Sequence, residues 1–232
     1  LSPSCAGAVR AGSYNLNSLM NAQTESLTLA GPVGPIEALL DLPVADGGTP
    51  RGTAVIAHPH PQFGGTMSNK VVQTLARACV QCGWRAVRFN FRGVGASAGH
   101  YDDGQGEQDD LLAVVARQAA PADAPLLLAG FSFGAFVASH AIARLHAQRP
   151  LAGAVLVGTA ASRFAVAPLP PPLHPRTLVV HGEHDETVPL ASVMDWARPQ
   201  LLPVTVVPGG GHFFHGQLPL LKSLVERHLR AL

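Results

Sequence analysis

The stretch Gly130-Phe131-Ser132-Phe133-Gly134 decides the fold, because of the segments on either side of it. The apolar run over residues 125–129 precedes it and predicts a buried strand. The alanine-rich amphipathic stretch over residues 135–146 follows it and predicts a helix. In a G-x-S-x-G pattern between a strand and a helix, small residues at both ends allow a sharp turn that holds the serine exposed in a strained conformation.

Strand and helix patterns alternate along the rest of the chain. Glycines and prolines at 31–35 separate two strand-like runs, 26–30 and 36–42, and predict an opening hairpin. Five further strands are predicted at 53–57, 85–91, 154–157, 177–180 and 204–207. Helices are predicted from Asn69 to Cys79, from about Glu107 onward, and over 218–232. Strands that alternate with helices predict βαβ units and a mostly parallel sheet.

The length of 232 residues fits one α/β domain with a sizeable core. No internal repeat or linker divides the chain, so we expect residues 23–232 to form a single domain. Residues 1–22 are expected to be an N-terminal extension, because 1–19 lack the basic and apolar regions of an intact signal peptide. Five prolines between residues 158 and 175 predict a rigid connection without an inserted helix.

Composition and charge exclude several classes of protein. A hydrophobic content of 47% excludes disorder, and no apolar run is long enough for a membrane-spanning helix. Sixteen Lys and Arg residues against fifteen Asp and Glu residues leave no basic patch for nucleic acid. The odd total of three cysteines fits a reducing compartment. We therefore expect a cytoplasmic protein without a nucleic-acid or membrane partner.

A serine hydroxyl becomes an effective nucleophile only beside a base, and the base needs an orienting acid. Loops after two of the predicted strands supply the candidates, Asp185 and His212. Both lie at carboxyl ends of buried strands, where open α/β sheets bind their ligands. Glu183 and Glu186 compete with Asp185 as the acid, and His215 competes with His212 as the base.

Together these motifs resemble those of the α/β-hydrolases and, within that fold, a small bacterial group of lidless serine hydrolases. The resemblance runs from Glu25 to the C-terminus and rests on 57–65, 89–95, 130–134, 182–185 and 211–214. It implies a mostly parallel central sheet flanked by helices, without a cap domain. The chain order of serine, then aspartate, then histidine is the order of that fold.

The resemblance also implies roles for the residues. Ser132 is expected to be the nucleophile, His212 the general base and then acid, and Asp185 the group that orients the imidazole. The backbone N–H of Phe133 is expected to be one oxyanion donor. The second donor should come from the loop that begins His58-Pro59-His60, where His60 takes the donor position. A proline stands there in place of the family's usual glycine, so Gln62 is the alternative donor if the loop is shifted.

Aromatic residues in and beside these loops predict an apolar substrate pocket, formed by Phe63, Phe131, Phe164 and Phe213. Hydrolysis of a small-molecule carboxylic ester with a short to medium acyl chain, without cofactor or metal, is the function expected. A serine peptidase or amidase, or a thioesterase, on the same three residues is the alternative.

Two other classes remain open from the sequence. His58 and His60 form an H-x-H pair that could bind a metal ion, with His181, His184 and Asp185 completing the ligands. A metal ion bound at these residues would make the protein a metal-dependent hydrolase. A hydrolase-like module that binds without catalysis is the third reading, although none of the three proposed catalytic residues is missing.

Overall fold

One mixed sheet of eight strands forms the centre of the computed structural model, which describes residues 24–43, 49–119 and 121–232. Across the sheet the strands follow the order β1-β2-β4-β3-β5-β6-β7-β8. β1 and β2 form the predicted hairpin, β2 also pairs antiparallel with β4, and the remaining neighbours are parallel. The strands are β1 (Thr24–Gly31), β2 (Gly34–Asp41), β3 (Thr53–Ala57), β4 (Arg85–Phe89), β5 (Leu126–Phe131), β6 (Leu151–Val157), β7 (Thr177–Gly182) and β8 (Val204–Val207). The predicted mostly parallel sheet is confirmed.

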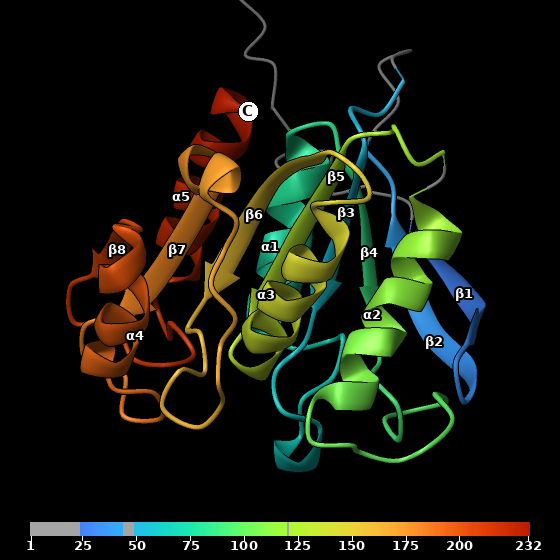
Figure 1. Cartoon of the computed structure of the whole chain (residues 1–232), viewed down its shortest axis with the longest axis horizontal. Coiled ribbons are helices and arrows are strands. Elements are labelled where there is room, and N and C mark those ends of the chain that lie inside the picture. The colour runs from blue at the N-terminus through green and yellow to red at the C-terminus, as the bar shows by residue number, and fades with distance from the viewer. Residues whose placement is uncertain (1–23, 44–48, 120) are drawn as a thin grey trace, which may run out of the picture.

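Helices cover both faces of this sheet (Figure 1). On the face toward the viewer lie α2 (Gln105–Gln118), α3 (Phe133–Leu145) and α4 (Leu190–Ala197). On the far face lie α1 (Lys70–Gln81) and α5 (Leu218–Ala231). Two buried apolar clusters fill the spaces between sheet and helices, one on each face. Because both faces are covered, the central strand β5 is buried throughout and its sequence is a continuous apolar run.

The connection from β6 to β7 lies against the body of the molecule. The imidazole Nε2–H of His140 in α3 donates to the carbonyl of Ala165 at 2.8 Å. The backbone N–H of Ala167 donates to Ser139 Oγ of α3 at 3.0 Å, and Trp196 Nε1 of α4 donates to the Ala167 carbonyl at 3.2 Å. The expected absence of a cap domain is confirmed, although a six-residue 3₁₀ helix, Pro171–Arg176, forms in this proline-rich segment.

Some boundaries differ from the prediction. α4 has no counterpart among the predicted helices, because its eight residues span about two turns and follow Pro189 directly. The strand predicted to reach residue 91 ends at Phe89, and the side chain of Asn90 bonds to the adjoining segments instead. The N-terminal extension predicted for residues 1–22 lies outside the described residues, so that domain boundary stays a prediction.

Candidate active site

Ser132 lies at the predicted sharp turn, between β5 and α3. Its backbone has φ +56° and ψ −116°, a conformation that costs free energy for any residue except glycine. The Ser132 N–H donates to the Val157 carbonyl at 2.8 Å, and its own carbonyl accepts from the Ala135 N–H at 3.0 Å. A Cβ on Gly130 would lie 2.3 Å from the Gly134 carbonyl oxygen. Both the backbone bonds and the glycines therefore hold the strained serine in place.

Ser132, His212 and Asp185 form a chain of hydrogen bonds with triad-like geometry. His212 Nδ1 lies 2.7 Å from Asp185 Oδ2, and His212 Nε2 lies 3.0 Å from Ser132 Oγ. A carboxylate accepts only, so Nδ1 carries the hydrogen and Nε2 presents its lone pair to the serine hydroxyl. All three residues are buried. The loops after β5, β7 and β8 thus converge at the carboxyl edge of the sheet.

Asp185 receives hydrogen bonds on both carboxylate oxygens. Oδ1 accepts from the backbone N–H groups of Thr187 at 3.0 Å and Val188 at 2.7 Å, while Oδ2 accepts from His212. Burial alone would raise the pKa of Asp185, but the bonds from His212 and Val188 outweigh it and hold that pKa below its ordinary value. The carboxylate therefore stays charged beside the imidazole.

The rival candidates lie elsewhere. Glu183 Oε2 accepts from the Gly209 N–H at 2.8 Å and so ties the β7 loop to the β8 loop. Glu186 is exposed at the surface. His215 is exposed and stacks on Phe213 with ring centroids 5.9 Å apart. Asp185 and His212 are therefore the acid and imidazole that the fold brings to the serine.

The loop after β3 lies against the start of α3. A Cβ on Gly134 would lie 2.3 Å from the Ala57 carbonyl oxygen, so the two backbones touch. His60 follows in this loop, and its ring lies 5.0 Å from the Phe133 ring. His60 Nδ1 accepts from the Gln62 N–H at 3.2 Å, so the Gln62 N–H is occupied within the loop.

Aromatic rings lie beside His60, Phe133 and His212. Phe63 is 73% exposed and Phe213 is 44% exposed, while Phe164 is partly buried. Phe131, predicted to contact substrate, is completely buried, with its ring 4.9 Å from the His212 ring. Phe131 belongs to the buried apolar cluster that also contains Leu127 and Ala129, so its ring packs in the core and against His212.

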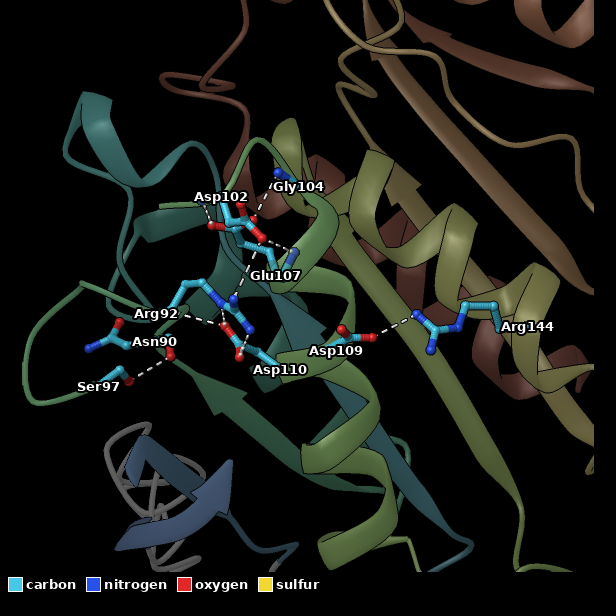
Figure 2. A network of polar contacts seen from close by, with 10 residues as sticks. Asn90, Arg92, Ser97, Asp102, Gly104, Glu107, Asp109, Asp110 and Arg144 are labelled. Carbon is cyan, nitrogen blue, oxygen red and sulfur yellow. Dashed lines mark hydrogen bonds and ion pairs between the residues drawn. The ribbon is translucent and has the colours of Figure 1, made fainter. Parts of the chain in front are cut away.

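A buried ion pair braces the loop after β4 (Figure 2). Arg92 Nε and Nη2 donate to the two oxygens of Asp110 at 3.0 and 2.8 Å, and the Arg92 backbone N–H bonds to the same carboxylate. Glu107 accepts from the backbone N–H groups of Asp102 at 2.9 Å and Gly104 at 2.8 Å. Glu107 lies in the first turn of α2 and is completely buried, so its carboxylate ties the loop before α2 to the start of that helix.

A cleft of about 300 Å³ opens between the loops after β3 and β4. Its lining residues are Pro61, Gln62, Arg92, Gly93, Val94, Gly99, His100 and Tyr101. Tyr101 lies between the cleft and the proposed oxyanion donors, since its ring lies 4.8 Å from the His60 ring and 5.9 Å from the Phe133 ring. Tyr101 could not be recognised from the sequence, because an aromatic residue in a loop of unknown path carries no signal of its own.

The histidines of the H-x-H pair are not arranged as metal ligands. His58 Nδ1–H donates to the Pro59 carbonyl at 2.6 Å, and His58 Nε2 accepts from the Phe91 N–H at 3.0 Å. With both nitrogens bonded to backbone, His58 has no lone pair for a metal ion. Within the described ranges, no group of three or more His, Cys, Asp and Glu side chains is placed to hold one.

Fold and site together define an α/β-hydrolase of the serine type. A family model described as "Serine aminopeptidase, S33" matches residues 48–175, more than half of the chain. The chain is also 40% identical to a lidless α/β serine hydrolase from Xanthomonas campestris, covering 90% of this chain and 94% of that one with a TM-score of 0.79. This chain therefore belongs to the α/β serine hydrolases, in the small bacterial group without a lid.

Two other comparisons are more limited. An uncharacterised protein of Rickettsia prowazekii is 42% identical over 93 residues, which span 39% of each chain. Est1E from Butyrivibrio proteoclasticus, solved with ferulic acid bound, is 18% identical over 88% of this chain and 98% of that one, with a TM-score of 0.73. At that identity the likeness concerns the fold alone. None of the described helices is long and apolar enough to cross a membrane.

Proposed function

We propose that this serine hydrolase is a carboxylesterase that acts on esters with short to medium acyl chains. The observation that carries the proposal is the hydrogen-bonded chain from Ser132 through His212 to Asp185, with distances of 3.0 and 2.7 Å. Such a chain supplies what a serine needs to attack a carbonyl carbon: a base at its hydroxyl and an anion behind the base.

In the proposed reaction, Ser132 Oγ attacks the ester carbonyl while its proton passes to His212 Nε2. The resulting imidazolium is stabilised by Asp185, which keeps its negative charge throughout. His212 then gives the proton to the leaving alcohol, and an acyl-enzyme remains on Ser132. A water molecule, deprotonated by His212, releases the acid and restores the free serine.

The negative oxygen of the tetrahedral intermediate needs donors that are already in position. The Phe133 N–H is the first, because the opening N–H groups of a helix have no partner within the helix. The His60 N–H is the second, supported by the contact between the His60 and Phe133 rings. Gln62 is the weaker alternative, since its N–H already bonds to the His60 ring.

Phe63, Phe164 and Phe213 are the proposed substrate contacts, because their rings are at least partly exposed beside the site. Phe131 is not proposed as a substrate contact, since its side chain has no exposed surface. Est1E, solved with ferulic acid bound, illustrates that a protein of this fold can bind an aromatic acid. An ester is accordingly the first substrate class to test, before amides, peptides and thioesters.

The decisive experiment combines a variant with a covalent label. Ser132→Ala should lower kcat for p-nitrophenyl esters by about 10⁵- to 10⁶-fold, since only the oxyanion donors and binding remain. A fluorophosphonate should add to the wild type once, and peptide mass spectrometry should place the adduct on Ser132. A variant that keeps its activity, or an adduct on another serine, would show that Ser132 is not the nucleophile. Faster turnover of aminoacyl amides or thioesters than of any ester would move the function to the alternative class.

A further inference from the structure

His181 is a buried histidine that the proposed reaction does not use. It lies near the end of β7, four residues before Asp185, and is completely buried. By strand alternation its side chain faces the same side of the sheet as Val179, which belongs to the apolar cluster that also contains Val188 and Val193. An aliphatic side chain would suit this position if packing were the only requirement.

The hydrogen bonds of His181 define its tautomer. Nε2 lies 2.8 Å from the Val188 carbonyl oxygen, which can only accept, so Nε2 carries the hydrogen. Nδ1 has no hydrogen-bond partner among the described residues. Burial lowers the pKa of His181, with opposite contributions from the nearby Asp185 and His212, so the ring is neutral. A buried acceptor without a hydrogen-bond partner is unfavourable, so stability alone does not explain why an imidazole occupies this position.

The same ring nitrogen also lies near the carboxylate that orients His212. Nε2 lies 3.5 Å from Asp185 Oδ2, the oxygen bonded to His212 Nδ1. Val188, whose carbonyl accepts from His181, donates its own N–H to Asp185 Oδ1 at 2.7 Å. His181, Val188 and Asp185 are therefore in mutual contact, and movement of the imidazole would change the direction of the carboxylate.

We propose that His181 is a positioning residue that holds the Asp185 carboxylate in line with His212. The inference rests on the proposed function, because it assigns His181 a part in the same triad. By donating to the Val188 carbonyl, the ring fixes the residue whose own N–H holds Asp185 Oδ1, and it also places Nε2 3.5 Å from Oδ2. The arrangement has an energetic cost, because His181 Nδ1 is buried without a hydrogen-bond partner among the described residues.

The test compares His181→Leu with His181→Gln in the full-length enzyme. Leucine removes the donor but fills the space, whereas glutamine can place an N–H near the position of Nε2. His181→Leu should lower kcat about 10-fold with KM within about twofold, because a misdirected acid weakens the base and not substrate binding. The acid limb of its pH–rate profile should move in the same direction as in Asp185→Asn. His181→Gln should recover most of kcat.

A double-mutant cycle separates positioning from a structural role. In an Asp185→Asn background, His181→Leu should change kcat by less than about twofold, because the group that it positions has lost its charge. Val179→Ala is the matched control on the same face of β7. It should lower stability while leaving kcat per titrated active site and the acid limb unchanged.

Three results would overturn the inference: wild-type kcat in His181→Leu, the same factor of loss in both backgrounds, or an unmoved acid limb. These are distinct from failure of the proposed function. If the triad is wrong, Asp185→Asn itself keeps wild-type activity. If only His181 is misassigned, Asp185→Asn is severely impaired while His181→Leu is not.

Discussion

His58 is completely buried, and each of its ring nitrogens bonds to a backbone group. Burial lowers the pKa of His58 from 6.5 to about 4. An unfolded chain therefore binds a proton on His58 between these two values while the folded chain does not, so stability falls as pH falls through this window. The contribution is on the order of 3 kcal/mol, fully present above pH ~6.5 and lost at about pH 4.

Urea unfolding at a series of pH values measures this effect. His58→Gln should be less stable than wild type near neutral pH, because its backbone bonds are weakened, but its stability should fall less between pH 6.5 and 4. The exposed His215→Gln is the control and should keep the wild-type slope. Equal slopes for wild type and His58→Gln would contradict the prediction.

Asp185 carries the next prediction. Asp185→Asn should lower kcat by about 10⁴-fold, less than Ser132→Ala, because the imidazole survives but loses its orienting charge. Since the carboxylate stabilises the imidazolium, its loss should move the acid limb of the pH–rate profile to lower pH. The lowered pKa of Asp185 means that this carboxylate stays charged through this range, so the acid limb does not report protonation of Asp185 itself. Glu183→Gln, in the same loop, should keep its activity; the reverse pattern would mean that the acid is misplaced.

Sequence alone identified Ser132, Asp185 and His212 because each lies in a loop after a buried strand, in the order typical of the fold. It could not exclude Glu183, since only the path of the β8 loop shows that Glu183 bonds to Gly209. It placed Phe131 in the pocket although its side chain faces the core. The sequence also left His181 open as a possible metal ligand. Its hydrogen bond with the Val188 carbonyl depends on how the loop folds back, which the sequence does not show.

Among the elements, the junction of β5 and α3 tolerates the least change. Gly134 lies inside a helix, where alanine is normally favoured by about 1 kcal/mol. Here an added Cβ would lie 2.3 Å from the Ala57 carbonyl oxygen, so β3 and α3 must move apart. Gly134→Ala should therefore lower stability by about 1–3 kcal/mol and reduce kcat on the order of 100-fold through displacement of Ser132 and the His60 loop.

Gly216→Ala is the matched control for this substitution. Gly216 has φ +74° and nothing within 4 Å of an added Cβ, so only the backbone conformation is penalised, by about 1 kcal/mol. Thermal unfolding and kcat per titrated site should separate the two variants. Equal losses of activity in both would show that the clash at residue 134 is not the cause.

The elements themselves were largely predictable. The buried parallel strands have apolar runs bounded by glycine, proline or polar residues, and β3 and β8 have the predicted bounds. Asn69 caps α1 as expected, its side chain accepting from the Val71 N–H at 2.9 Å. Helix α4 escaped prediction because two turns contain too few residues for a periodic pattern, and tertiary packing of Val193 and Ala197 forms it.

At the level of the whole molecule, the absence of a lid limits the substrate. The β6–β7 connection is fixed to α3 and α4 by hydrogen bonds, so it does not serve as a hinged cover. An open site gains roughly 0.8 kcal/mol per buried methylene only until the apolar surface is filled. We expect the highest kcat/KM for acyl chains of roughly two to eight carbons.

A series of p-nitrophenyl esters tests this expectation, together with an emulsified long-chain triglyceride. Activity on the emulsion should not jump above the solubility limit, because no lid opens at an interface. Efficient, interface-activated hydrolysis of the triglyceride would contradict the expected preference for short chains. Phe63→Leu should flatten the dependence on chain length without changing the rate for acetate esters, since an acetyl group has no methylene to place against an aromatic ring.

The order of the strands bears on how the protein is made. From β5 to β8 the sheet grows outward in the order of the chain, so each new strand adds to an edge already present. During translation, β5 and Ser132 leave the ribosome before Asp185, and His212 emerges last of the three. On the proposed triad, a nascent chain therefore carries a serine with no base beside it. The enzyme would acquire its reactivity toward esters only when β8 has joined the sheet and the loop after it has brought His212 to the serine.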